Sequence, residues 1–369
     1  MGRAILGGFS FVDCLKRWMG VAGCAAGLAL FGVGCSSSSR PVQVAPEAFV
    51  PAVRENARAG TSTLPVAADH ALRIRFVGDI MLDRNVARRM REAGTSTYPF
   101  ARLPPGWLDE TDLTVANLEG PVTPTRRPPE KSIDFQFDPS VVGVLRAQGI
   151  DFVSQANNHA LDQGTQGFED SRALLLAGGI TPFGHQVRDD EIALATTTIR
   201  NTRLAFVGFN TTDNPLDEEA VARVLAAASS TSDLVIVFMH WGLEYQDHPI
   251  ADVQARARWL IDHGADLVIG GHPHWVQGMD EYKGKLIAHS LGNFIFDQDF
   301  SDETRQGLSL DVNIDRDRVC LIPHPLWIQA SQPALETGEA LAARIRTLAA
   351  ISYPSVRSDV ERGSVCRPR

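Results

Sequence analysis

Short apolar runs alternate with longer amphipathic segments from Leu72 onward. Brief apolar runs bounded by polar residues are typical of buried strands, whereas apolar positions spaced three and four apart indicate helices. Strands are predicted at 73–77, 113–116, 152–155, 204–209, 234–239 and 267–269, with a later pair at 278–282 and 286–289. Helices are predicted at 83–92, 139–148, 166–177, 217–228 and 250–263. Strands that alternate with helices predict a layered α/β domain.

The segments on either side of this pattern lack its regularity. Residues 35–70 are rich in Ser, Pro, Ala and Val without sustained periodicity, which is typical of a flexible tether. After about Asn313 the chain has two further apolar runs and a polar, arginine-bearing tail. The pattern therefore predicts one folded domain at 71–315 and a C-terminal extension at 316–369 whose role it does not indicate.

The first 34 residues have the layout of an export signal. Lys16 and Arg17 precede an apolar run of small residues that ends at Cys35, and serines follow this cysteine. A run this short and rich in glycine favours a cleaved lipoprotein signal over a membrane span. Lipidation is predicted at Cys35, with Cys24 or an uncleaved anchor as the alternatives. We therefore expect an exported protein, lipid-anchored to a membrane of the cell envelope.

The charge of the chain argues against nucleic acid as a partner. The formal net charge is −9, and removal of the signal takes away more basic than acidic residues. A protein that follows a phosphate backbone needs a basic stripe, and none is visible.

Two cysteines follow the predicted lipidation site, at Cys320 and Cys366. In an exported chain a disulfide between them is permitted, because the environment outside the cytoplasm is oxidising. Two free thiols are the alternative that the sequence leaves open.

Five predicted strands each end in a short group of Asp, Asn, Glu or His residues. The groups are Gly78-Asp79, Asn117-Leu118-Glu119, Asn157-Asn158-His159, Met239-His240 and Gly271-His272-Pro273-His274. In α/β sheets ligands bind outside the carboxyl ends of strands, so groups far apart in sequence can converge there. Carboxylates, amides and imidazoles together indicate a metal site.

Each of these residues also permits a structural role when it is taken alone. The alternatives are a helix cap at Asp79, a solvated turn acid at Glu119, turn bonds at Asn158 and His159, and a core histidine at His240. Two imidazoles on either side of a proline, as in the His-Pro-His segment, project to the same side and are harder to explain structurally. The joint pattern favours a metal site over these separate roles.

Six motifs then point to a known family. They are Gly78-Asp79-Ile80-Met81-Leu82, Asn117-Leu118-Glu119-Gly120, Asn157-Asn158-His159-Ala160-Leu161-Asp162, His240-Trp241-Gly242-Leu243-Glu244-Tyr245, Gly271-His272-Pro273-His274 and Ser290-Leu291-Gly292-Asn293-Phe294-Ile295-Phe296. In order and approximate spacing they resemble the CapA family, named for poly-γ-glutamate capsule production, from about Leu72 to Phe300. That family resembles the calcineurin-like metallophosphoesterases, which implies an α-β-β-α sandwich with two metals between paired sheets.

Carried over residue by residue, the resemblance implies a set of metal ligands: Asp79, Glu119, Asn158, His240, His272 and His274. The first metal would be held by Asp79 and His274, and the second by Asn158, His240 and His272, with Glu119 between them. The catalytic residues would be His159, which assists the leaving group, and Asp162, which orients the imidazole of His159. The implied cofactors are divalent metal ions, with manganese, iron or magnesium expected.

One position departs from the phosphoesterase pattern. That pattern has a histidine two residues after the first aspartate, and this chain has Met81, as the CapA pattern does. A thioether is a soft, neutral ligand that suits manganese, magnesium or ferrous iron poorly. The sequence therefore predicts a weaker first metal site.

Substrate contacts are predicted at Arg84, Trp241, Glu244 and Asn293. Trp241 and Tyr245 flank Glu244 and could line a groove for an extended polymer, or pack as ordinary aromatic residues. Arg84 and Arg88 lie on one predicted helix face and could meet carboxylates of an anionic substrate, or form a solvated face.

The resemblance implies an exported, membrane-tethered metal-dependent hydrolase in capsule or poly-γ-glutamate synthesis or processing. The expected partners are an anionic cell-surface polymer, the membrane through the lipid anchor, and membrane proteins of capsule synthesis. Two other functions remain open: a non-catalytic assembly or anchoring component with a structural metal site, and a general phosphoesterase.

Overall fold

A computed structural model describes residues 71–369 of the chain. The predicted signal at 1–34, the tether and the lipidation site at Cys35 lie outside the described residues. Within 71–369, no helix combines the length and the apolar character needed to cross a membrane.

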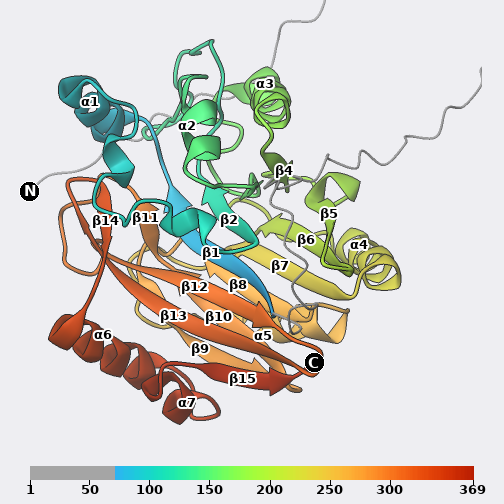
Figure 1. Ribbon diagram of the computed structural model, residues 1–369. Helices are drawn as coiled ribbons and strands as arrows, with labels where there is room; N and C mark the ends of the chain where they lie inside the picture. Colours follow the sequence, from blue (N-terminus) through green and yellow to red (C-terminus); the bar gives the residue numbers. More distant parts are fainter. Residues whose placement is uncertain (1–70) are drawn as a thin grey trace, which may run out of the picture. The chain divides into compact units, whose positions relative to one another are not determined.

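Two β-sheets form the centre of the described residues (Figure 1). The first sheet has the order β14-β13-β12-β1-β2-β3-β4, with β11 also paired to β1 and β15 to β13. Its strands are β1 (Leu72–Ile80), β2 (Leu113–Leu118), β3 (Phe152–Ser154), β4 (Thr181–Phe183), β11 (Asn293–Ile295), β12 (Gln306–Ile314), β13 (Arg318–Gln329), β14 (Gln332–Leu335) and β15 (Val365–Pro368).

The second sheet has the order β5-β6-β7-β8-β10-β9. Its strands are β5 (Leu194–Ile199), β6 (Thr202–Asn210), β7 (Leu234–His240), β8 (Leu267–Gly271), β9 (Val276–Tyr282) and β10 (Lys285–Leu291). The helices are α1 (Arg84–Ala93), α2 (Val141–Ala147), α3 (Gly164–Ala177), α4 (Glu218–Thr231), α5 (Ala251–Asp262), α6 (Gly338–Ile351) and α7 (Arg357–Glu361).

Three apolar clusters separate four layers. The first cluster lies between the sheets, where the rings of Phe76 and Phe206 have centroids 6.3 Å apart. The second packs α1, α2 and α3 on the outer face of the first sheet, for example through Leu145 of α2. The third packs α4 and α5 on the outer face of the second sheet, for example through Leu225 of α4. This layering confirms the α-β-β-α sandwich.

The predicted strands and helices all occur, with ends that shift by a few residues. β7 is buried along its whole length, as expected for a continuous apolar run in a parallel sheet covered on both faces. Asp83 caps the N-terminus of α1, because its side chain accepts a hydrogen bond from the N–H of Arg84. The helix ends at Gly94, which has φ of 68° and bonds back to the carbonyls of Met90 and Arg91.

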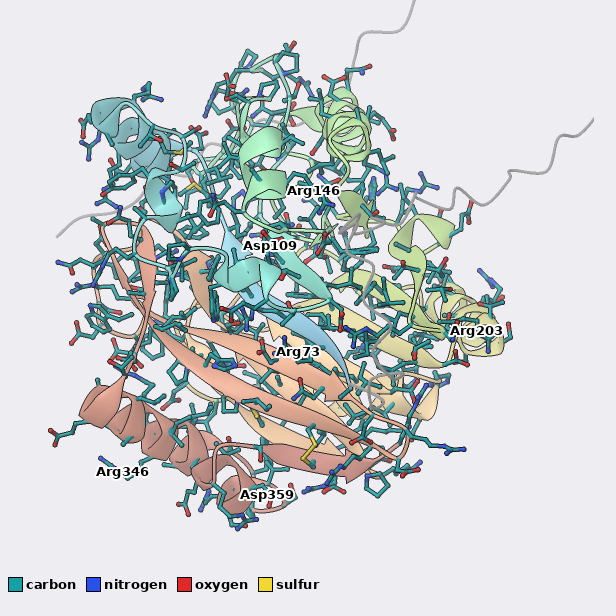
Figure 2. The ribbon with its side chains drawn as sticks, in the orientation of Figure 1. Arg73, Asp109, Arg146, Arg203, Arg346 and Asp359 are labelled. Carbon is teal, nitrogen blue, oxygen red and sulfur yellow. A yellow bond between two sulfur atoms is a disulfide. The ribbon has the colours of Figure 1, made fainter. Side chains whose placement is uncertain are left out.

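Residues 316–369 belong to the folded domain, which corrects the predicted boundary at 315. β13, β14 and β15 extend the first sheet by antiparallel pairing. Leu348 of α6 and Val360 of α7 join the apolar cluster between the sheets. A disulfide joins Cys320 of β13 to Cys366 of β15, which face each other in register (Figure 2). Of the two alternatives that the sequence left open, the structure therefore shows the disulfide and not two free thiols.

The carboxyl ends of the parallel strands in both sheets carry the predicted ligands. In register, Asp79 of β1 lies opposite Asn117 of β2, and His240 of β7 lies opposite Gly271 of β8. A Cβ atom on Gly271 would lie 2.8 Å from Asp79 Oδ1, so the absence of a side chain permits this approach between the sheets. The chain then crosses from β10 to β11 at Gly292, which has φ of 63°.

Candidate metal centre

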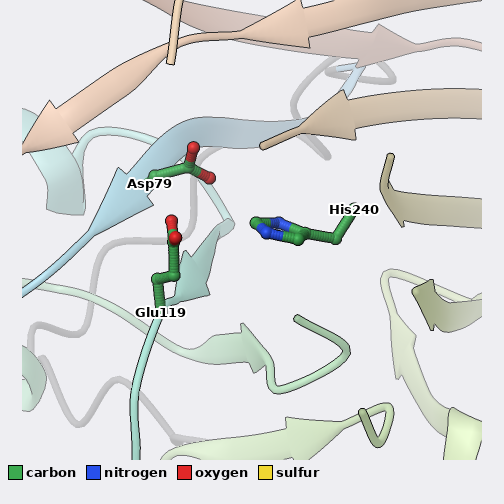
Figure 3. A group of neighbouring side chains, drawn as sticks. All are labelled: Asp79, Glu119 and His240. Atoms are coloured by element: carbon green, nitrogen blue, oxygen red, sulfur yellow. The ribbon is translucent and has the colours of Figure 1, made fainter. Parts of the chain in front are cut away.

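Asp79, Glu119 and His240 converge at the carboxyl ends of their strands (Figure 3). One ligand atom from each lies within 4.8 Å of the others. Asp79 lies in β1 and Glu119 directly follows β2, whereas His240 ends β7 in the second sheet. All three side chains are buried. Both sheets therefore contribute to one compact group of potential metal ligands.

The two histidines after β8 complete one side of this group. The ring of His272 lies 4.8 Å from that of His240 and 6.1 Å from that of His274, measured between centroids. His274 Nδ1 is 3.5 Å from Asp79 Oδ2, and its Nε2 is 3.9 Å from Glu119 Oε1.

The backbone around Pro273 is strained. His272 has φ of 92° and His274 has φ of 57°, although neither residue is glycine. Non-glycine residues in this region cost of order 1–3 kcal/mol each, and such residues are concentrated at functional sites. The strain is consistent with a turn retained because it places two imidazoles beside the carboxylates.

Two asparagines connect the remaining ligands. Asn158 Oδ1 lies 2.9 Å from His240 Nε2. Asn117 Nδ2 donates to Asp79 Oδ1 at 2.8 Å and lies 3.3 Å from His240 Nδ1. His240 therefore has an asparagine side chain beside each of its ring nitrogens. The structure thus brings all six predicted ligands together; their binding of metal stays a prediction.

Asn117 is a site residue that was not predicted from the sequence. Its signal was its place at the end of β2, two residues before Glu119, among the polar groups that close the strands. Its amide also accepts a hydrogen bond from Asn157 Nδ2 at 3.0 Å. Asn117 therefore orients the side chains of both Asp79 and His240 through its amide nitrogen.

The carboxylates carry negative charge that the protein does not fully compensate. Both oxygens of Glu119 are buried without a hydrogen-bond partner among the described residues. Burial, and next the charge of Asp79, raises the pKa of Glu119 well above its usual value. Burial opposes protonation of His274, but the carboxylates of Glu119 and Asp79 raise its pKa to about 9.

The other two imidazoles are held neutral. Burial, and next the charge of His274, lowers the pKa of His272 to about 3. Burial, followed by the nearby histidines, lowers the pKa of His240 well below its usual value. The neutral imidazole is the form that binds metal. The oxygens of Glu119 and Nδ1 of His272 have no hydrogen-bond partner within residues 71–369, and this donor set fits a divalent cation.

Met81 does not supply a donor to this group. Its side chain is buried in the apolar cluster beneath α1, and its sulfur accepts a hydrogen bond from the N–H of Asp83 at 3.1 Å. The expected loss of one donor at the first metal site is consistent with this packing.

His159 and Asp162 form the expected pair. His159 Nδ1 lies 2.7 Å from Asp162 Oδ2, and the Asp162 side chain is only 1% exposed. A carboxylate can only accept, so it fixes Nδ1 as the protonated nitrogen and leaves Nε2 to exchange a proton. Burial lowers the pKa of His159, and the bond to Asp162 opposes this shift.

Two of the four predicted substrate contacts are wrong. Trp241 is completely buried, and its Nε1 donates to the carbonyl of His289 at 2.9 Å, so it packs in the core. Asn293 is also completely buried; its Oδ1 bonds His274 Nδ1 at 2.9 Å and its Nδ2 bonds the carbonyl of Thr304 at 3.0 Å. Asn293 therefore orients His274 and has no surface to offer a substrate.

Arg84 and Glu244 remain predictions as substrate contacts. The Arg84 side chain is 35% exposed, forms an ion pair with Asp297, and has φ of 49°. Its guanidinium lies 5.0 Å from the ring centroid of Phe135. Glu244 is exposed on the loop after β7.

The four layers define an α-β-β-α sandwich protein, and the buried group of carboxylates and imidazoles gives it a candidate metal site. Residues 73–298 match the family described as bacterial capsule synthesis protein PGA_cap. The chain belongs to this family, which confirms the resemblance to CapA drawn from the motifs.

Relatives and one solved structure show the extent of the likeness. The PGA biosynthesis protein CapA of Bacillus subtilis (strain 168) is 30% identical over 258 residues, which cover 65% of this chain and 67% of that protein. The capsule biosynthesis protein CapA of Bacillus anthracis is 27% identical over 317 residues, covering 80% and 75%. A phosphatase structure from Mycoplasma pneumoniae has a TM-score of 0.39 and 9% identity, covering 73% of this chain and 92% of its own. The fold assignment rests on the layers described above.

Proposed function

We propose that this protein is an exported, lipid-anchored, metal-dependent hydrolase that acts on an anionic cell-surface polymer. The observation that carries the proposal is the buried carboxylate of Glu119, which lacks a hydrogen-bond partner among the described residues and lies within 4.8 Å of Asp79 and His240 ligand atoms. Burying two carboxylates with incomplete compensation is costly, so this arrangement favours a bound cation.

The metal would be held by Asp79, Glu119, Asn158, His240, His272 and His274. A divalent cation in this position supplies Lewis acidity that polarises a carbonyl or phosphoryl oxygen. Asn117 keeps the carboxylate of Asp79 in place through its 2.8 Å hydrogen bond, and Asn293 does the same for His274 at 2.9 Å.

His159 is the proposed proton donor to the leaving group. Its Nδ1 is committed to Asp162, so the proton moves at Nε2. His159 is only 7% exposed, which limits exchange with bulk water. This division of roles assigns orientation to Asp162 and proton transfer to His159.

The proposed substrate and location rest on the family and on the N-terminal segment. Relatives are named for PGA and capsule biosynthesis, which supports an anionic polymer as the substrate class. The segment before Cys35 supports export and lipid anchoring, and membrane proteins of capsule synthesis are the proposed further partners.

The test combines metal analysis with an activity screen. The purified full-length protein is analysed for bound elements and then assayed with manganese, magnesium or ferrous iron on a γ-glutamyl polymer and a phosphodiester probe. His272→Ala is expected to lower turnover by more than about 100-fold, because even outer-shell partners of metal ligands cost about 10–100-fold. His248→Ala is the matched control, since His248 has a 60% exposed side chain paired with Asp247.

Equal activity of His272→Ala and His248→Ala with saturating metal would overturn the hydrolase proposal. Polymer binding without release of small products would instead favour a non-catalytic assembly component. Cleavage of the phosphodiester alone would favour a general phosphoesterase.

A further inference from the structure

Lys131 lies over the proposed catalytic pair, although the sequence provided no signal for it. It belongs to the connection between β2 and α2, which is rich in proline and charged residues. Its ammonium donates to the carbonyl of Asn158 at 2.6 Å and lies 2.7 Å from Asp162 Oδ1. A residue of this connection is thereby fastened to the segment that carries His159.

The two oxygens of Asp162 have different surroundings. Oδ2 accepts hydrogen bonds from His159 Nδ1 and from the backbone N–H of Phe135, both at 2.7 Å. Oδ1 has no aligned hydrogen bond among the described residues, and its compensation there is the charge of Lys131. The Asp162 side chain is only 1% exposed, so this carboxylate has little contact with water while Lys131 is in place.

The same connection also covers the imidazole. The Phe135 ring lies 4.1 Å from the His159 ring, measured between centroids. Lys131 and Phe135 thus hold the pair from two sides, one through charge and one through packing and a backbone hydrogen bond.

We propose that Lys131 is a positioning residue, which keeps the Asp162 carboxylate oriented so that His159 carries its proton on Nδ1. The proposal rests on the proposed function of His159. It predicts that Lys131 acts on turnover through Asp162, without contacting the reacting atoms.

The asymmetry of exposure distinguishes this pair from an ordinary surface ion pair. The Lys131 side chain is 42% exposed against 1% for Asp162, whereas Lys283 and Asp262 are 62% and 36% exposed. Exposed pairs contribute little, but removal of one partner from a buried charge leaves that charge uncompensated. Without Lys131, the Asp162 carboxylate must rotate, take up a proton or admit water, and each change weakens its hold on His159.

The test uses the full-length protein with magnesium and compares wild type with Lys131→Met, Lys131→Arg and Lys283→Met. The tautomer of His159 is measured by ¹⁵N NMR of histidine-labelled protein, and kcat and KM are measured on the substrate found in the activity screen. Lys131→Met should lose the single Nδ1-protonated form and lower kcat by about 10–100-fold with little change in KM. Lys131→Arg should keep both the Nδ1-protonated form of His159 and the wild-type kcat, and Lys283→Met should match wild type in both.

Each other outcome is decisive. An unchanged His159 tautomer in folded Lys131→Met would overturn the proposal, whatever the activity. A raised KM with unchanged kcat would identify Lys131 as a substrate contact and also overturn it. If wild type shows no turnover, the proposed hydrolase function fails, whereas the tautomer measurement still tests Lys131.

Discussion

Single residues of this site hold charge where water does not reach. Glu119 is completely buried with neither oxygen hydrogen-bonded in the part of the chain that the structure describes, and Asp79 lies beside it. Asn117 and Asn293 orient ligands without carrying charge. A site built in this way trades stability of the metal-free protein for affinity toward a cation.

Glu119→Gln should raise the stability of the metal-free protein and weaken its binding of metal. The substitution is expected to stabilise the protein in EDTA by about 1–3 kcal/mol, because it removes a buried carboxyl group that has no hydrogen-bond partner among the described residues. The increase in Tm on adding manganese should shrink at the same time. Thermal unfolding with EDTA and with manganese measures both effects, and a lower Tm of the variant in EDTA would contradict the expectation.

The buried carboxylate of Asp311, unlike that of Glu119, is paired with basic side chains and has a lowered pKa. Arg75 donates to Asp311 at 2.7 and 2.8 Å, and His324 Nε2 lies 3.1 Å from the same carboxylate. Burial of Asp311 opposes ionisation, but its bonds to Arg75 and His324 lower its pKa to about 2. A depressed carboxyl pKa contributes stability above its unfolded value, about 3.9, and this contribution is lost as the pH falls toward 2.

Asp311→Asn tests this contribution. At pH 7 the variant should lose roughly 3–5 kcal/mol of unfolding free energy, because Arg75 remains buried without its partner. The difference in unfolding free energy between the variant and wild type should become smaller as the pH falls from about 4 to 2. Urea unfolding across this range provides the measurement. Asp262→Asn, at an exposed ion pair, is the control and should change the unfolding free energy by less than about 1 kcal/mol at pH 7. If the unfolding free energies of Asp311→Asn and wild type differ by the same amount at all pH values, the expectation is contradicted.

Among the elements, the strand ends decide how closely the two sheets meet. β1 and β8 each carry glycine next to a ligand, so their backbones approach neighbouring carbonyl groups. A Cβ atom on Gly78 would lie 1.9 Å from the carbonyl oxygen of Gly292, and one on Gly270 would lie 2.0 Å from that of His289. These glycines are therefore required by packing, and the ligands depend on them for their positions.

Gly78→Ala should destabilise the protein by about 1–3 kcal/mol or more, because the added methyl group must displace backbone. It should also weaken metal binding, since Asp79 follows directly. Gly143→Ala in α2 is the matched control. Apart from the backbone of the helix itself, no atom of the described residues lies within 4 Å of the added Cβ. Alanine also favours a helix by about 1 kcal/mol over glycine. Urea unfolding and metal titration compare the two variants, and similar stabilities would contradict the packing argument.

For the molecule as a whole, the C-terminal segment closes the sandwich. α6 and α7 contribute to the cluster between the sheets, and β13 carries both β14 and β15 (Figure 1). The Cys320–Cys366 disulfide spans 46 residues and encloses α6 and α7 in one covalent loop. The loop restricts the unfolded chain more than the folded one.

Cys366→Ser should lower the unfolding free energy by about 2–4 kcal/mol, because the covalent loop no longer restricts the unfolded chain. Wild type in reducing buffer should approach the stability of the variant. Thermal unfolding with and without reductant measures the effect, and a variant whose Tm equals that of oxidised wild type would contradict it.

Much of the fold and of the ligand set could be predicted because both depend on local order along the chain. Apolar periodicity located the inner strands and their helices, and polar residues at strand ends indicated Asp79, His240 and His272 as candidate ligands, which the structure places close together. Parallel strands place their carboxyl ends at one edge, so this inference needs no coordinates. The tail after 315 was less readable, because the pairing of β13, β14 and β15 joins segments distant in sequence.

Other assignments depended on which side chains meet in three dimensions. Burial showed that Trp241 packs in the core and that Asn293 orients a ligand, whereas their motif positions alone suggested substrate contacts. Lys131 became visible only through its contacts with Asp162 and Asn158. The physical reason is that residue order specifies chemistry and strand direction, while exposure and long-range partners arise from the packing of both sheets.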